Sequence, residues 1–481
     1  MQVSERLQQL KPSATIAMTE KARELKTQGK DIISLSIGEP DFETPDFIKE
    51  AAIQAIHDNY NHYTPVPGFA DLRETICEKF KRDNGIDYTP NQIVVSTGAK
   101  NTIYNIIQSL VNPGDEVIIP APYWVSYADI TELAGGVPVV LKAGIEDDYK
   151  VSAEKLKAAI GPKTKAVLYS SPCNPSGSVL SKEDLAAWVE VLKEHPNVTI
   201  ISDEIYEHIH YADKPVSIAS FPEVYNQTVT VNGLAKGFAM TGWRIGFMGG
   251  PEWIAKACGK LQGQVTSGTN AIAQRAAITA LKADPKDMKY MLDAFAKRRD
   301  LVIGLASNIP LFKVNQPKGA FYLFPDVSAC FGKSFKGKTI NDSNDLAMYL
   351  LEEAGVATVS GAAFGAENCL RISYATGEDQ LKEAVFKHFK KLASGFDPLF
   401  KVNQPKGAFY LFPDVSACFG KNFKGKTIND ADDLAMYLLE EAGIATVSGG
   451  AFGAENCLRI SYATGEDQLK EAFRRITEAL A

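Results

Sequence analysis

Residues 199–206 read Thr-Ile-Ile-Ser-Asp-Glu-Ile-Tyr, and residues 228–236 read Thr-Val-Thr-Val-Asn-Gly-Leu-Ala-Lys. Each stretch is a short apolar run that ends in reactive groups, an acid with a phenol in the first and a lysine in the second. Outward from them, similar runs alternate with amphipathic stretches from about residue 46 to residue 286, a pattern typical of strands and helices. This alternation predicts an α/β fold whose mostly parallel sheet is flanked by helices.

The expected strands cover residues 93–97, 116–120, 137–141, 165–170, 198–202, 228–232 and 244–249. A helix is expected over 181–194, with Ser181 as its N-cap and acidic residues in its first turn. Long helices are expected over 252–282 and 286–307. Residues 1–45 and those after about 287 are expected to form a smaller α+β domain from both ends of the chain.

Ligands of open parallel sheets collect at the carboxyl ends of the strands, so the residues that follow each run are the first candidates. Gly98, Ala99 and Lys100 open a helix whose free N–H groups suit a phosphate, and Arg244 can clamp the same phosphate. Lys236, placed among glycines and apolar residues, fits a desolvated amine of lowered pKa. The other candidates at these strand ends are Trp124, Asn174, Asp203 and Tyr206.

Each of these residues alone also fits an ordinary role. Lysines are mostly solvated, an acid after a strand often caps a helix, an arginine forms salt bridges and a tryptophan packs in the core. The combination favours a site in which Asp203 faces a protonated pyridine nitrogen, Trp124 stacks on the ring and Lys236 reacts as an amine.

The C-terminal third contains a long repeat, because residues 311–384 recur at 399–472 with 69 of 74 positions identical. Such identity indicates a single duplication of part of one domain rather than a solenoid array, whose repeats diverge and stack in larger numbers. We therefore expect an N-terminal segment of the small domain at 1–45, a large cofactor-binding domain at 46–286, a small C-terminal domain at 287–393 and its duplicate at 394–481. The copies differ only at Ser334/Asn422, Ser343/Ala431, Asn344/Asp432, Val356/Ile444 and Ala362/Gly450.

Composition excludes several classes of protein. The 481 residues carry 51 Lys+Arg against 58 Asp+Glu, a net charge of −7, which argues against a nucleic-acid partner. No apolar stretch is long enough for a membrane span and the N-terminus lacks a signal-like run, so we expect no membrane partner and a cytoplasmic address. Seven cysteines without a C-x-x-C pair predict reduced thiols rather than disulfides or zinc.

His208 and His210 have the spacing of metal ligands on a strand. Without a third ligand nearby, a partly exposed strand is the favoured interpretation, and no metal is expected. The glycine-rich run around 233–250 lacks the pattern of a nicotinamide site.

Several ordered motifs together resemble the class I and II aminotransferases of the pyridoxal-phosphate fold type I group, and closely the bacterial aspartate aminotransferases. They span the chain outside the duplicate: Lys11-Pro12-Ser13-Ala14-Thr15, Gly38-Glu39-Pro40-Asp41-Phe42, Tyr63-Thr64-Pro65, Pro122-Tyr123-Trp124-Val125-Ser126-Tyr127, Asn174-Pro175-Ser176-Gly177, Ser202-Asp203-Glu204-Ile205-Tyr206, Ala235-Lys236 through Arg244, Gly319-Ala320-Phe321-Tyr322 and Arg371-Ile372-Ser373-Tyr374.

The resemblance implies a role for each matching residue. Lys236 would bind pyridoxal 5′-phosphate covalently and move the proton between the substrate Cα and the cofactor. Asp203 would hold the pyridine nitrogen, Asn174 and Tyr206 the ring oxygen, and Trp124 the ring face. The phosphate would lie among Gly98, Ala99, Lys100 and Arg244, with Tyr63 reaching in from the second subunit of a homodimer.

The substrate α-carboxylate would be bound by the Gly38 backbone and an arginine, beside Trp124 and Asn174. That arginine is Arg371 or its duplicate Arg459, and we favour Arg371 because the first copy follows the preceding helix without an insertion. Against this, the second copy ends in residues 473–476, a more typical helical terminus.

The implied activity is transfer of an amino group between L-aspartate and 2-oxoglutarate by a ping-pong mechanism. Lys100, Ser13 and Thr15 are candidates for the second carboxylate. Two alternatives stay open: an aromatic, alanine or prephenate specificity, and an impaired non-catalytic protein in which the duplicate blocks dimerisation or domain closure.

Overall fold

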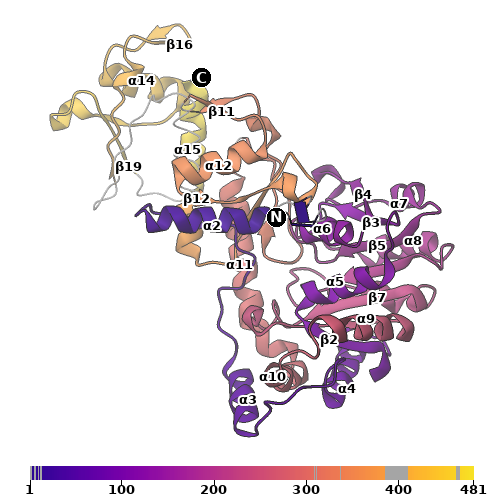
Figure 1. Ribbon diagram of the computed structural model, residues 1–481. Helices are drawn as coiled ribbons and strands as arrows, with labels where there is room; N and C mark the ends of the chain where they lie inside the picture. Colours follow the sequence, from indigo (N-terminus) through magenta and orange to yellow (C-terminus); the bar gives the residue numbers. More distant parts are fainter. Residues whose placement is uncertain are drawn as a thin grey trace. The chain divides into compact units, whose positions relative to one another are not determined.

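The computed structural model describes residues 13–384, 410–461 and 466–480 except Asn308, Pro310 and Lys336, together with residues 3, 4, 7, 8 and 10 (Figure 1). The chain divides into two compact units, residues 1–389 and residues 390–481. All seven cysteines are free thiols. None of the helices within the described ranges is long and apolar enough to cross a membrane.

A seven-stranded sheet forms the centre of the first unit, in the order β2-β8-β7-β6-β5-β3-β4. Its neighbours run parallel except β8, which is antiparallel to both β2 and β7. The predicted mostly parallel sheet is therefore confirmed, with each strand within a residue or so of its expected position. The bounds are β2 Ile93–Thr97, β3 Glu116–Ala121, β4 Val137–Lys142, β5 Thr164–Ser170, β6 Thr199–Asp203, β7 Thr228–Gly233 and β8 Ile245–Gly249.

Helices cover both faces of this sheet, because successive side chains of a strand point to opposite sides. In β3, Val117 and Ile119 pack with Ile106 of one helical layer, whereas Ile118 packs with Trp188 of the other. The helices of the unit are α2 Ala14–Thr27, α3 Asp46–His57, α4 Ala70–Lys79, α5 Ala99–Leu110, α6 Ser126–Leu133, α7 Ala153–Ala159, α8 Lys182–Leu192, α9 Glu252–Val265, α10 Ala271–Lys282, α11 Lys289–Ala306 and α12 Ser343–Ala354.

The N-cap predicted for α8 is confirmed, since the Asp184 N–H donates to Ser181 Oγ at 3.1 Å and Asp184 accepts from the Ser181 N–H. The single helix expected over 252–282 is wrong. The chain breaks between α9 and α10, where Ser267 has a left-handed backbone with φ of 57°. Asn270 then caps α10 by accepting from the Ala273 N–H at 2.8 Å, as short polar residues do at helix starts.

Both ends of the first unit meet in small sheets. Strand β1 (Ile33–Ser34) pairs in parallel with β12 (Val356–Ala357). A three-stranded antiparallel sheet has the order β13-β14-β9. Its strands are β9 Tyr322–Leu323, β13 Val359–Ser360 and β14 Leu370–Ser373, and the hairpin β10 Ser334–Phe335 and β11 Lys338–Thr339 lies between β9 and α12 in the chain.

The second unit repeats the three-stranded sheet, the hairpin and the helix that follows the hairpin. Its three-stranded sheet has the order β15-β19-β18, which matches β9-β14-β13 of the first copy. Helix α15 packs on α14, and the Tyr437 hydroxyl donates to the Ala479 carbonyl at 2.6 Å. The elements are β15 Tyr410–Leu411, β16 Asn422–Phe423, β17 Lys426–Thr427, α14 Ala431–Ala442, β18 Val447–Ser448, β19 Leu458–Ser461 and α15 Glu466–Ala479.

Candidate active site

Three neighbouring parallel strands end at one edge of the large sheet. Ser170 of β5 lies opposite Asp203 of β6, and Asp203 lies opposite Val231 of β7. The segments that follow these strands carry Asn174 and Lys236. The shared register therefore brings together groups that lie more than 60 residues apart in the chain.

Asp203 is buried at the end of β6. Its Oδ2 accepts a 2.7 Å hydrogen bond from the Tyr127 hydroxyl, and its Oδ1 accepts one of 3.2 Å from the Ile205 N–H. Burial raises the pKa of Asp203 to about 6, although the Tyr127 hydrogen bond opposes the shift. A cation that faces such a buried carboxylate stabilises its charged form.

Lys236 follows β7, and its amine donates to the Gly38 carbonyl. Its Nζ lies 5.8 Å from the ring centres of both Tyr206 and Phe321. Burial lowers the pKa of Lys236 to about 8, and the nearby Arg371 cation lowers it further. The amine is therefore neutral, and so nucleophilic, far more often near neutral pH than a solvated lysine is.

Tyr206 and Tyr322 close the site beside Gly38. Their hydroxyl groups share a hydrogen bond of 2.8 Å. A Cβ atom at position 38 would lie 2.5 Å from the Tyr322 hydroxyl, so a larger residue there would displace this group. The Gly38 backbone can therefore approach both the lysine and this pair of hydroxyl groups.

An anion cradle forms where α5 begins. Gly98, at φ of 85°, precedes the helix, and a Cβ there would lie 2.4 Å from Arg244 Nη2. Arg244 Nη1 donates to the Thr241 carbonyl at 2.9 Å, and a pocket of about 830 Å³ opens beside Arg244. Helix N–H groups and a guanidinium at one point fit a phosphate.

Lys100 lies in the first turn of the same helix. Its Nζ lies 4.8 Å from the ring centre of Trp124. Burial lowers the pKa of Lys100, and the Arg244 cation lowers it further. Trp124 is partly buried and makes an edge contact with the ring of Tyr127, the residue whose hydroxyl binds Asp203.

Arg371, on strand β14, is 1% exposed. Its Nη1 donates to Asn174 Oδ1 at 3.1 Å and its Nη2 to the Ser36 carbonyl at 2.5 Å. Its Nε is buried without a hydrogen-bond partner. Within the described ranges no carboxylate pairs with this guanidinium, and a buried cation of this kind fits a carboxylate ligand.

The duplicate arginine has different surroundings. Arg459 is half-buried over the ring of Phe452, at 4.6 Å. Phe452 is exposed, whereas its counterpart Phe364 is fully buried. Asn174 and Ser36 lie outside the repeated segment, so the second unit has no copy of either.

The remaining candidates lie apart from this group in the single chain. Tyr63 is 99% exposed. Ser13 precedes α2 and Thr15 lies in its first turn, and no hydrogen bond among the described residues joins either side chain to the groups above. Three residues of this group have no role in the predictions from the sequence: Tyr127, Tyr322 and Ser36. The two tyrosines lie in motifs quoted above, so those motifs could have pointed to them. Ser36 contributes only its backbone carbonyl, which no side-chain pattern predicts.

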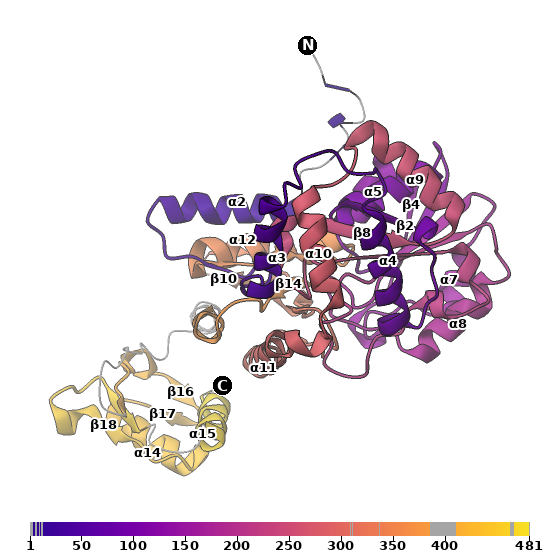
Figure 2. The same ribbon diagram turned by 90° about the horizontal axis from the view of Figure 1, so that it is seen from below.

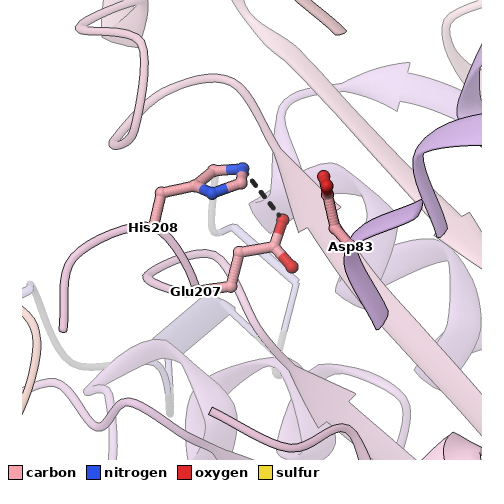
Figure 3. A group of neighbouring side chains, drawn as sticks. All are labelled: Asp83, Glu207 and His208. Atoms are coloured by element: carbon pink, nitrogen blue, oxygen red, sulfur yellow. Dashed lines mark ion pairs between the residues drawn. The ribbon is translucent and has the colours of Figure 1, made fainter. Parts of the chain in front are cut away.

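Near this site, Asp83, Glu207 and His208 converge (Figure 3). The expectation that His208 has no further potential ligand nearby is thus wrong. So is the strand expected there, because residues 205–208 form a turn that begins where Asp203 Oδ1 accepts the Ile205 N–H. His210, by contrast, forms an isolated bridge with Gly319 and is absent from the cluster.

Lysine and arginine side chains of the protein already pair with the two carboxylates of this cluster. Lys79, 1% exposed, forms an ion pair with Glu207, and Arg82 binds both oxygens of Asp83 at 2.7 and 2.8 Å. His208 Nε2 lies 3.2 Å from Glu207. This arrangement is that of a buried ion-pair network rather than a metal centre.

A sequence profile of the family "Aminotransferase class I and II" matches residues 30–387 and again residues 378–476. The aspartate/prephenate aminotransferase of Cereibacter sphaeroides is 48% identical over 387 residues, which are 79% of this chain and 96% of that protein. A bifunctional aspartate aminotransferase and glutamate/aspartate-prephenate aminotransferase of Petunia hybrida is 43% identical, over 82% of this chain and 83% of that protein. The crystal structure of the Rhizobium meliloti aspartate aminotransferase superposes with a TM-score of 0.80 at 42% identity, covering 82% of this chain and 99% of the other.

Proposed function

The chain belongs to the class I and II aminotransferases, which use pyridoxal 5′-phosphate, and on that premise we propose that it exchanges amino groups between L-aspartate and 2-oxoglutarate by a ping-pong mechanism. One observation carries this proposal. A lysine of lowered pKa, a buried aspartate and a buried arginine, which no carboxylate of the described residues pairs with, meet in one site.

The side chains fit the cofactor. Arg244 with Gly98, Ala99 and Lys100 offers the N-terminus of α5 and two positive charges to the phosphate. Asp203 would pair with the protonated ring nitrogen. Asn174 and Tyr206 would hydrogen-bond to the ring oxygen, and Trp124 would stack on the face of the ring. Tyr63, almost fully exposed in one chain, is proposed to complete the site of the second subunit of a homodimer.

When bound, the cofactor supplies a ring that accepts the electron pair left at the substrate Cα. Asp203, held by Tyr127, keeps a negative charge opposite the ring nitrogen. The Lys236 amine would remove the proton from the substrate Cα and would deliver a proton to the cofactor. Its lowered pKa suits both roles.

Arg371, rather than Arg459, is proposed to bind the α-carboxylate of the substrate. Its two Nη atoms are already oriented by Asn174 and Ser36, and its Nε remains available. Binding there gives the buried guanidinium a charge-assisted pair. Arg371 binds the Ser36 carbonyl, and the Lys236 amine binds the Gly38 carbonyl two residues further along the chain. A substrate held by Arg371 would therefore have its Cα directed toward Lys236.

Lys100, Ser13 and Thr15 remain candidates for the second carboxylate. Prephenate is a second candidate acceptor, because relatives at 43–48% identity carry both aspartate and prephenate in their names. Prephenate, like aspartate, bears two carboxylates, so a site with the positive charges to bind aspartate could also bind prephenate.

Initial rates with L-aspartate as donor and either 2-oxoglutarate or prephenate as acceptor test the proposal. Double-reciprocal plots at several fixed acceptor concentrations should give parallel lines, as expected when one product leaves before the second substrate binds. Turnover of aromatic amino acids or alanine without turnover of aspartate would contradict the proposed specificity. Absence of turnover with every pair would favour the impaired protein.

A further inference from the structure

The connection between α3 and α4 ends in residues 63–69, which we call the tyrosine loop after its first residue, Tyr63. The Tyr63 side chain is 99% exposed, so its own burial does not hold it in place. The residues behind the loop must therefore set the position that Tyr63 offers to a second subunit. Helix α10 packs against both α3 and α4, and Figures 1 and 2 show it between them.

Gln274 of α10 holds both ends of the tyrosine loop, and its side chain is fully buried. Its Oε1 accepts a 2.9 Å hydrogen bond from the Phe69 N–H. Its Nε2 donates to Thr64 Oγ1 at 3.1 Å and to the Thr269 carbonyl at 2.9 Å. Only the oxygen of an amide accepts from an N–H group, so the Phe69 contact fixes which way this amide faces. One side chain thus anchors the last residue of the loop and the residue next to Tyr63.

The middle of the tyrosine loop is held by a second buried glutamine, Gln262 of α9. Its Nε2 donates to the Val66 carbonyl at 2.7 Å and to the Val95 carbonyl at 2.9 Å. The Val95 N–H in turn donates to the Pro67 carbonyl at 3.0 Å. Val95 lies on β2, the strand that leads to Gly98. The loop that one chain offers to its partner is therefore built against the strand that leads to its own phosphate cradle.

Loss of the Gln274 amide would leave the Phe69 N–H and the Thr269 carbonyl without a buried partner. Such groups are costly to leave unsatisfied, and the loop would move toward water to satisfy them. We propose that Gln274 is a positioning residue for the active site of the other subunit, because its amide fixes the place from which Tyr63 reaches the cofactor phosphate there. This inference rests on the proposed homodimer.

Gln274→Met tests the role of the amide, because methionine keeps an unbranched side chain of similar size without the N–H donors and the carbonyl acceptor. The dissociation constant of pyridoxal phosphate for the cofactor-free chain should rise about tenfold or more, as expected when a hydrogen bond to a charged group is lost. Tyr63→Phe should raise it to a similar extent. Fluorescence titration of chains that sediment as dimers measures both.

Gln227→Met is the matched control. Gln227 is also buried, and its Nε2 donates to three carbonyls of the loop before β6, those of Leu192, His195 and Val198, at 3.0–3.3 Å. That loop lies at the start of β6, whereas Asp203 lies at its end. Gln227→Met should therefore leave the dissociation constant unchanged.

Hybrid dimers, purified through two different affinity tags, distinguish action on the partner from a local defect. In the first hybrid, a natural chain is paired with a chain that carries both Lys236→Ala and Gln274→Met. The cofactor site of the natural chain should bind as weakly as Gln274→Met does, because its partner supplies the displaced Tyr63. In the second hybrid, Gln274→Met is paired with Lys236→Ala alone and should bind as the natural chain does. The visible band of the cofactor bound to Lys236 reports only the site that has this lysine.

Natural affinity in the first hybrid, weak binding in the second, or an unchanged dissociation constant for Gln274→Met would overturn the inference. Thr64→Val removes the hydroxyl that accepts from Gln274 and must give the same hybrid pattern, which keeps the test decisive if Gln274→Met does not fold. A sedimentation mass of one chain would overturn the homodimer together with this inference, whereas a contrary hybrid pattern in a dimer overturns the inference alone. The readout is cofactor affinity, so it stands whichever amino acids the enzyme accepts.

Discussion

Arg371 and Asn174 lie 197 residues apart in the chain, yet Nη1 of the arginine donates a 3.1 Å hydrogen bond to Oδ1 of the asparagine. This bond joins strand β14 of the small sheet to the segment that follows β5 of the large sheet. It fixes the guanidinium within reach of the groups that surround Lys236. The position of the substrate carboxylate therefore follows from the packing of two sheets rather than from a local motif.

Arg371→Gln should lower kcat/KM for L-aspartate strongly, because it removes a buried charge-assisted pair with the α-carboxylate. Losing one partner of such a pair costs about 2–5 kcal/mol, equivalent to roughly 30- to 4,000-fold in kcat/KM. Arg459→Gln is the matched control, the same change in the second copy, and should leave kcat/KM as it is. Steady-state kinetics of both variants measure this, and the opposite pattern would transfer the site to the second copy.

Gly98→Ala should weaken cofactor binding by tenfold or more, because the added Cβ would meet Arg244 Nη2 at 2.4 Å. Gly114→Ala controls for backbone strain. Gly114 has φ of 87° but open space around its Cβ position, so both variants carry about 1–2 kcal/mol of left-handed strain. Fluorescence titration of the cofactor-free variants with pyridoxal phosphate measures the dissociation constants. Equal constants for the two variants would show that Gly98 and Arg244 do not hold the phosphate.

The rate at which the cofactor-free chain takes up pyridoxal phosphate should rise with pH through about 8 and then level off. Burial lowers the pKa of Lys236 to about 8, and only the neutral amine attacks an aldehyde. The amine is protonated below that pKa and neutral above it, so the rate increases as pH rises. Stopped-flow absorbance across pH 6–10 follows the reaction. A rate that still climbs at pH 10 without levelling off, as for a solvated lysine, would contradict the lowered pKa.

Tyr127→Phe should shift the acid limb of cofactor binding to higher pH. Burial raises the pKa of Asp203 to about 6, and the Tyr127 hydrogen bond holds it from rising further. Cofactor affinity should fall as pH decreases through this pKa, because the protonated carboxyl no longer attracts the ring nitrogen. In Tyr127→Phe, which lacks this hydroxyl, cofactor affinity should begin to fall at a higher pH. Tyr169→Phe is the matched control, since the Tyr169 hydroxyl binds Ser202 rather than Asp203, and an identical shift in both variants would contradict the mechanism.

Much of the candidate site was predictable because parallel strands carry it. The carboxyl ends of such strands meet at one edge, so Asn174, Asp203 and Lys236 could be brought together from strand positions alone. Gly98 and Arg244 follow from the same logic, because each lies beside a strand of the same sheet. Their roles remain a proposal that the experiments above address.

What the sequence could not supply depends on packing between distant segments. The Ser36 carbonyl meets Arg371 across 335 residues, and the Tyr206 hydroxyl meets Tyr322 across 116. No periodicity encodes such contacts. The break between α9 and α10 was missed because residues 266–270 interrupt an otherwise continuous helical pattern. The Asp83 cluster was missed because Asp83 precedes Glu207 by more than a hundred residues.

The repeat was evident from the sequence, and so was the single N-terminal segment available to cover its two copies, but the burial of each residue was not. Leu351 and Leu439 have the same neighbours in the chain, yet the first is buried and the second is 46% exposed. The difference lies in the N-terminal segment, which is present once. Identity of sequence therefore does not give identity of burial when the covering segment is not duplicated with it.

The most direct test of the account is the absorption spectrum of the cofactor-loaded chain on addition of L-aspartate and then 2-oxoglutarate, recorded beside Lys236→Ala. We predict that aspartate converts the visible band of the protein-bound cofactor into the near-ultraviolet band of its amino form, that 2-oxoglutarate restores the first band, and that Lys236→Ala shows no such cycle. A band that does not respond to aspartate, or an unchanged cycle in Lys236→Ala, would contradict the assignment of this site as an aspartate transaminase centre built on Lys236.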